Sequence, residues 1–159
     1  MVHIALYVKE VMVQEVIKVR ADATVKEAVR IINKHEIACL IVTKNGENVG
    51  ILIDRDVLKR VIPRSKNPEK AKVTEIMSTP LIVGGSDMYV EDAARLMFKK
   101  NIKKFPIMEN GKLVGASDLI KYCPNCTHAI IGQGNKRTQG KRVASSKTNE
   151  KSHRHLHIT

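Results

Sequence analysis

The chain has 159 residues and a formal net charge of +12, with 43% hydrophobic residues, 3% aromatic residues and no Trp. This length suits one compact domain or two small units that share an aliphatic core. Five of the first 20 residues are charged, and no apolar run reaches the roughly 20 residues of a membrane helix, so we expect a cytoplasmic protein without membrane contact. Three cysteines do not form the disulfide framework of a secreted scaffold.

An internal duplication organises the chain, because the sequence matches itself at an offset of 65 residues. VKEA at 25–28 matches VEDA at 90–93, and Asn-Gly at 45–46 matches Asn-Gly at 110–111. Val-Gly at 49–50 likewise matches Val-Gly at 114–115. Beyond this glycine the offset falls to 62, since DVLK at 56–59 aligns with DLIK at 118–121. The second copy has therefore lost three residues between its glycine and its aspartate.

Both copies predict the element order β-α-β-β-α. A short strand comes first, over 16–19 and 81–83. An amphipathic helix follows, because apolar residues recur at i, i+3, i+4 and i+7 in each copy: Val25, Ala28, Val29 and Ile32, then Val90, Ala93, Ala94 and Met97. ACLIV at 38–42 and KFPIM at 104–108 then read as strands, and each Asn-Gly pair closes a hairpin. A second hairpin strand and a short helix complete the unit.

One such unit leaves a face of its sheet uncovered, so we expect the two copies to pack sheet to sheet in an α/β (α+β) fold. We place the first repeat at 8–60 and the second at 73–122. The linker at 61–72 contains Pro63 and Pro68, which break regular structure. Residues 123–159 are expected to form a partly disordered basic tail, since the segment from 121 to 159 carries eight Lys/Arg and one acidic residue.

The motif at 49–59, VGILIDRDVLK, reads as a strand, a sharp turn and the start of a helix. Gly50 permits a close backbone approach at the strand. Asp56 lies where the helix begins. Its carboxylate can cap that helix, or it can face a cleft and accept hydrogen bonds from a ligand's hydroxyl groups. Both interpretations remain open.

The tandem repeat with Val-Gly followed by aliphatic residues and Arg-Asp resembles the CBS-domain family, and two copies together resemble a Bateman module. The resemblance covers about residues 8–122. Cys-x-x-Cys after the second copy is similar to archaeal members that carry a C-terminal zinc ribbon. The resemblance implies a non-enzymatic regulatory homodimer that binds AMP, ADP, ATP or S-adenosylmethionine in clefts between the repeats.

In the first-copy cleft, the resemblance assigns Asp56 to the ribose hydroxyls. Two positions depart from the family pattern: the hydroxyl position is Ile53 and the basic position is Cys39. The other residues implied to line this cleft, two of them from the second copy, are Gly50, Ile51, Arg55, Met88 and Tyr89.

In the second-copy cleft, the resemblance assigns Asp118 to ribose and Lys104 to phosphate. Ser117 supplies a hydroxyl one residue before the aspartate, where the family has it three residues before. Ala23 and Thr24 are implied to reach across from the first copy. A lysine after a helix can also simply complement the helix dipole. We expect at most one good site per chain, at this second cleft.

The tail contains Cys123 and Cys126, whose spacing lets two thiolates hold one zinc or iron ion. A closed site needs two more ligands, and the alternative is a tail with free thiols. Its net charge of +7 from residue 121 onward can also attract nucleic acid without sequence preference. The sequence therefore leaves three functions: a nucleotide-binding regulatory module, a dimeric nucleic-acid-associated protein, or a metal-binding protein.

Overall fold

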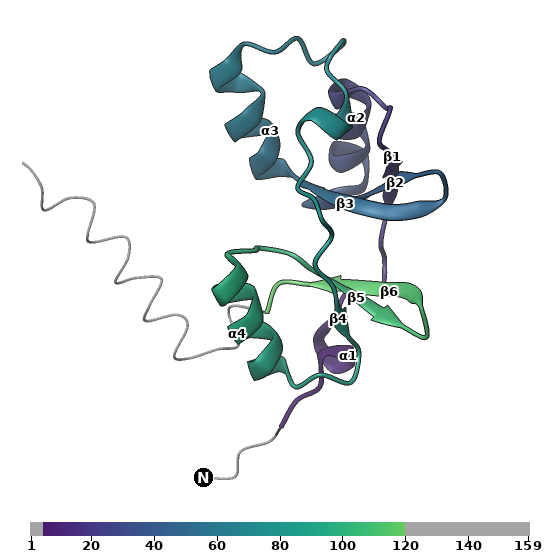
Figure 1. Ribbon diagram of the computed structural model, residues 1–159, viewed down its shortest axis with the longest axis vertical. Coiled ribbons are helices and arrows are strands. Elements are labelled where there is room, and N and C mark those ends of the chain that lie inside the picture. Colours follow the sequence, from purple (N-terminus) through teal and green to yellow (C-terminus); the bar gives the residue numbers. More distant parts are fainter. Residues whose placement is uncertain (1–4, 120–159) are drawn as a thin grey trace, which may run out of the picture.

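The computed structural model describes residues 5–119, which form two similar units (Figure 1). The first unit contains β1 (Lys18–Arg20), α2 (Val25–His35), β2 (Cys39–Lys44), β3 (Glu47–Ile53) and α3 (Asp54–Arg60). The second contains β4 (Gly84–Gly85), α4 (Val90–Lys100), β5 (Phe105–Glu109) and β6 (Lys112–Ser117). Three short helical turns complete the described chain: α1 (Val8–Val11), η1 (Ile62–Arg64) and η2 (Val73–Glu75).

Each unit has a three-stranded sheet with one topology. The first strand runs parallel to the second, and the second pairs with the third as an antiparallel hairpin. The turn residues Asn45 and Gly46 have φ values of 52° and 82°, and Asn110 and Gly111 have 49° and 74°. Asn and Gly adopt this left-handed conformation readily, so the two predicted hairpins are confirmed.

The helices cover the outer face of each sheet. On α2, the predicted apolar stripe of Val25, Ala28 and Ile32 is buried against Leu40 and Val42 of β2. Ile41, between those two strand residues, points to the opposite face and is also fully buried. The two sheets lie next to each other in the middle of the molecule, with helices outside them (Figure 1). The predicted sheet-to-sheet α+β arrangement is thus confirmed.

The first strand of each unit is shorter than predicted and begins further along the chain. β1 begins at Lys18 and pairs only with residues 41–43 of β2, and β4 comprises only Gly84 and Gly85. The prediction followed the β-branched composition of 16–19 and 81–83, whereas the register with the next strand decides which residues pair. The short helix predicted after Asp118 lies outside the described residues.

Two segments, which we call the crossing segments, each pack on the unit built by the other copy. Residues 71–78 contact the first unit: Val73 N–H donates to Ala23 O at 2.9 Å, and Ser78 bridges Ile51. Residues 6–13 contact the second unit through equivalent residue pairs, each shifted by 65 residues along the chain. Their counterpart bonds are Val8 N–H to Met88 O at 2.9 Å and the bridge from Val13 to Ala116.

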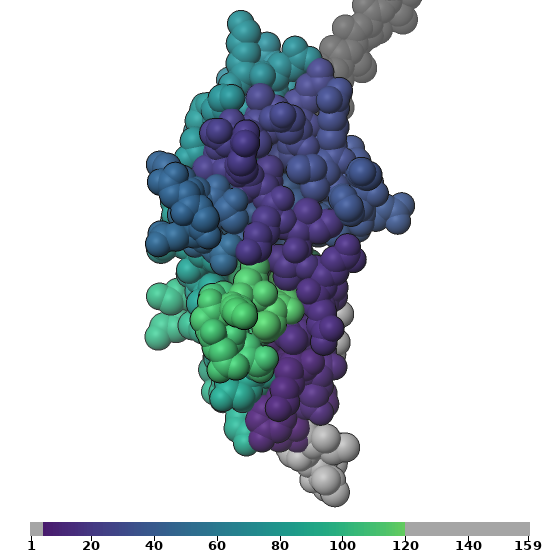
Figure 2. Space-filling view, turned by 90° about the vertical axis from the view of Figure 1, so that its right-hand side faces the viewer, coloured from purple at the N-terminus to yellow at the C-terminus, as the bar shows by residue number. Residues whose placement is uncertain are grey.

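The crossing segments belong to the cores of the units they contact. Ala71, Val73 and Ile76 are buried in the first core, and Val8 is buried in the second. Figure 2 shows the N-terminal segment, in purple, running along the second unit beside its green C-terminal strands. Each repeat therefore contributes a segment to the core of the other, and this exchange of crossing segments joins both repeats in one structure.

Two equivalent glycines make room for the crossing segments. A Cβ atom added at Gly50 would lie 2.7 Å from the Ser78 carbonyl oxygen and 2.9 Å from Met77 Sδ. At Gly115 it would lie 2.8 Å from both the Val13 oxygen and Met12 Sδ. Side-chain atoms do not tolerate such distances to a backbone oxygen, so the repeated Val-Gly pair is explained by the close approach of a neighbouring chain.

Candidate functional site

Asp56 is the centre of the candidate site. It lies in the first turn of α3 and is only 6% exposed. Its Oδ2 accepts a hydrogen bond from Ile53 N–H at 3.1 Å, and its Oδ1 lies 3.4 Å from Arg60. The capping role expected from the sequence is therefore present. A carboxylate has about four acceptor positions, so Asp56 retains capacity for a ligand's hydroxyl groups.

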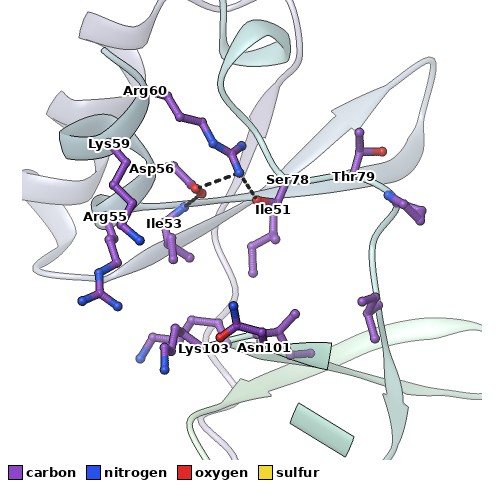
Figure 3. Close-up of a pocket in the computed structure, with 14 residues that line it drawn as sticks. Ile51, Ile53, Arg55, Asp56, Lys59, Arg60, Ser78, Thr79, Asn101 and Lys103 are labelled. Carbon is purple, nitrogen blue, oxygen red and sulfur yellow. Dashed lines mark hydrogen bonds and ion pairs between the residues drawn. The ribbon is translucent and has the colours of Figure 1, made fainter. Parts of the chain in front are cut away.

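Arg60 connects Asp56 to the crossing segment 71–78. Its Nη1 donates to the carbonyl oxygens of Ile76 and Met77, both at 2.7 Å. Its Nη2 donates to Ser78 Oγ at 3.1 Å (Figure 3). Because charged donors make the stronger hydrogen bonds, this guanidinium holds the segment against α3. Arg60 thus positions one wall of the site.

A cavity of about 350 Å³ opens between the two units beside Asp56. Its apolar surface comes from five side chains of both units: Ile51, Ile53, Pro80, Ile82 and Ile102. Its polar groups include the hydroxyls of Ser78 and Thr79 and the amide of Asn101. A pocket of this size, with both apolar and polar surface, suits a small organic ligand.

Five cationic side chains line the same cavity: Arg55, Lys59, Arg60, Lys103 and Lys104. The first three lie on α3, and the two lysines follow α4 and precede β5 in the chain. Lys103 lies opposite Arg55 and Lys59 (Figure 3). The cavity therefore combines an acceptor for hydroxyl groups, an apolar surface and a concentration of positive charge. This combination fits a ligand with a flat apolar part, a sugar and a phosphate group.

Lys104 lies between the motifs of both copies. It lines the Asp56 cavity, and its Nζ is 3.6 Å from Asp118 Oδ2. The Asp118 side chain is 51% exposed, so this ion pair adds little stability. The equivalent position in the first copy is Cys39, where burial raises the pKa of the thiol and the charge of Lys104 opposes that rise.

Three of the residues assigned to the first cleft come together: Asp56, Ile51 and Arg55 all line the cavity. Gly50 precedes Ile51 in the chain, and its missing side chain allows the Ser78 backbone to come close. The other two first-cleft residues are placed elsewhere. Tyr89 stacks on Tyr7 with ring centroids 5.0 Å apart. Met88 bonds to Val8 through its backbone oxygen.

The second-cleft assignments are also divided. Lys104 meets Asp118 as expected, and Ser117 is buried beside it in the chain. Ala23 and Thr24, expected to reach this cleft, instead contact the crossing segment 71–78 through Val73 and Lys72. Ligand contact by these residues stays a prediction.

Sequence reasoning did not identify Lys59, Arg60, Ser78, Thr79 and Asn101 as parts of a site. One signal was available for Arg60, because it follows Asp56 by four residues on a helix. No signal indicated that Ser78 would lie beside Asp56, since this contact depends on the exchange of the crossing segments.

The proposed metal ligands Cys123 and Cys126, with the whole basic tail, lie outside the described residues. Within residues 5–119, no group of three or more His, Cys, Asp or Glu side chains is placed to hold a metal ion. No helix in that part of the chain is long and apolar enough to cross a membrane.

Comparison with known sequences matches residues 8–63 and 73–116 to the family described as CBS domain. The CBS domain-containing protein YhcV of Bacillus subtilis is 33% identical over 108 residues, which cover 68% of this chain and 76% of YhcV. Protein MK0525 of Methanopyrus kandleri is 36% identical over 110 residues, 68% of this chain but only 56% of that longer protein.

Two solved structures share the fold. The CBS domain protein TA0289 of Thermoplasma acidophilum has a TM-score of 0.73 and 28% identity, covering 83% of this chain and 78% of its own. The CBS domain pair of protein MJ0100, in complex with 5-methylthioadenosine and S-adenosyl-L-methionine, has a TM-score of 0.64 and 24% identity, covering 82% and 98%. With the duplicated units and matching motifs described above, these likenesses show that the chain belongs to the CBS-domain family.

Proposed function

We propose that the chain is a non-enzymatic regulatory module that binds an adenosine nucleotide in the cavity between its two CBS repeats. The observation that carries the proposal is the meeting of Asp56, an apolar surface and five cations around one space of about 350 Å³. Asp56 would accept the ribose hydroxyls, the isoleucines would contact the adenine, and Lys104 would contact phosphate.

The ligands of the MJ0100 domain pair support the adenosine part of the proposal, because both contain adenosine. The proposed site also differs from the sequence expectation in the copy to which it is assigned. That expectation favoured the second copy because Lys104 belongs to it, but Lys104 projects into the cavity of the first-copy aspartate. Asp56 lines this cavity together with residues of the second copy, whereas Asp118 lines neither described cavity, so we assign the site to Asp56.

The proposal is tested by calorimetric titration of AMP, ADP, ATP and S-adenosylmethionine. A ligand at 100 times its dissociation constant stabilises the fold by about 2.7 kcal/mol, so thermal unfolding gives an independent readout. Asp56→Asn should weaken binding by roughly 10- to 100-fold, since hydrogen bonds to a charged acceptor contribute about 1.5–3 kcal/mol. Asp22→Asn, an exposed carboxylate outside this cavity, is the matched control.

Two outcomes would contradict the proposal. If no adenosine compound binds measurably, the proposed function is wrong. Loss of binding in Asp118→Asn, with Asp56→Asn unaffected, would move the site to the second cleft. The other predicted features, a homodimer, a zinc or iron ion at Cys123 and Cys126, and nucleic-acid attraction by the tail, remain predictions.

A further inference from the structure

A second cavity of about 320 Å³ adjoins the Asp56 cavity. The two have Ile53, Arg55, Lys103 and Lys104 in common, so they form one elongated space. We call the second part the outer cavity. Its remaining lining residues are Asp54 and Leu58. A ligand bound at Asp56 therefore has room to extend between Arg55 and Lys103.

The charges along this space are unbalanced. Its lining contains five cations and two carboxylates, a net of three positive charges. Arg60 is paired with Asp56, and Asp54 accepts the backbone N–H of Arg55 at 2.7 Å. Asp118, outside both cavities, offsets part of the charge of Lys104.

Three of the cations, Arg55, Lys59 and Lys103, form no ion pair with any residue between 5 and 119. Arg55 and Lys59 are four residues apart and share one face of α3, opposite Lys103 (Figure 3). Like charges that face each other across a partly enclosed space repel, and an anion between them removes that repulsion. The arrangement therefore favours a ligand with several negative charges in a row.

We propose that this space selects adenosine di- and triphosphate over adenosine monophosphate, with the distal phosphates held in the outer cavity between Arg55 and Lys103. This inference rests on the proposed function and adds the number of phosphates that the site recognises. The positively charged sulfonium group of S-adenosylmethionine meets like charges here, so that ligand is disfavoured.

The expected order of affinity is ATP, then ADP, then AMP. Each added phosphate should gain about tenfold, the effect of one further charge-assisted contact. The preference should also weaken as salt rises from 50 to 500 mM, because the added affinity is electrostatic.

The test compares calorimetric titrations of the parent chain with the double variant Arg55→Gln/Lys103→Gln. The variant should lose ATP affinity by about 100-fold and AMP affinity by much less, so that the affinities for ATP, ADP and AMP become similar. The matched control is Lys34→Gln/Lys99→Gln. It removes the same charge from exposed, repeat-equivalent positions outside both cavities and should keep the order.

Three results would decide the matter. The inference is supported if the parent chain and the control variant bind ATP more tightly than ADP and ADP more tightly than AMP, and if only the Arg55/Lys103 variant loses these differences. AMP binding as tightly as ATP in the parent chain would overturn the inference and leave the proposed function standing. Absence of binding by every adenosine compound would overturn both.

Discussion

Replacing Gly50 by Ala should destabilise the protein and disturb the cavity, because the added Cβ would lie 2.7 Å from the Ser78 carbonyl oxygen. That oxygen accepts Ile51 N–H at 3.0 Å, so it cannot withdraw without stretching the bridge between β3 and the crossing segment. Overpacking costs about 1–3 kcal/mol, and Gly→Ala regains about 0.4–1 kcal/mol through the unfolded chain. The net expectation is a loss of about 1–2 kcal/mol, or about 4–8 °C in melting temperature for a domain of this size.

Gly115→Ala provides the matched comparison, since its Cβ meets the equivalent oxygen of Val13 at 2.8 Å. Both variants should lose similar stability in urea unfolding. Only Gly50→Ala should also weaken nucleotide binding, because Ser78 and Thr79 belong to the wall of the Asp56 cavity. If Gly50→Ala unfolds within about 0.3 kcal/mol of the parent protein, the steric explanation of the repeated glycine is wrong.

Two further predictions concern the attachment of the same crossing segment. Arg60→Met should reduce the free energy of unfolding by about 2–3 kcal/mol in urea titrations. It removes three hydrogen bonds and leaves the buried Asp56 carboxylate without its ion-pair partner. An unchanged urea midpoint would contradict this role of Arg60. Hydrogen bonds from Lys66 and from the Lys72 backbone lower the pKa of Glu75, so the stability they give is present above the unfolded-state pKa near 4.5 and is lost as the pH falls through the folded-state value. Glu75→Gln should therefore flatten the loss of stability below about pH 4.5, and a slope equal to that of the parent protein would refute it.

The order of elements could be predicted from the sequence because local patterns determine it. The spacing of Val25, Ala28 and Ile32 specifies the buried face of α2 without reference to the rest of the chain. Asn45-Gly46 likewise specifies its own turn. Strand ends were less predictable, because β1 and β4 are limited by their register with β2 and β5.

The exchange of crossing segments could not be predicted, since the duplication itself hides it. Val13 and Ser78 are equivalent residues, and so are Ile51 and Ala116, so a segment can pair within its own copy or with the other copy through the same bonds. Only the path of the linking chain in space distinguishes these pairings. The placement of Lys104 beside Asp56 depends on that path, which explains why the sequence grouped it only with Asp118.

The bridge between Val13 and Ala116 also affects the order of events during synthesis, because its partners are about a hundred residues apart in the chain. At about 5–20 residues per second, residues 6–13 leave the ribosome about 5–20 s before their partners exist. The first unit, by contrast, meets its crossing segment at 71–78 soon after its own strands are made. We therefore expect residues 17–78 to acquire structure first on the ribosome, and the early segment around Val8 to wait for the last strand before it becomes protected from proteolysis.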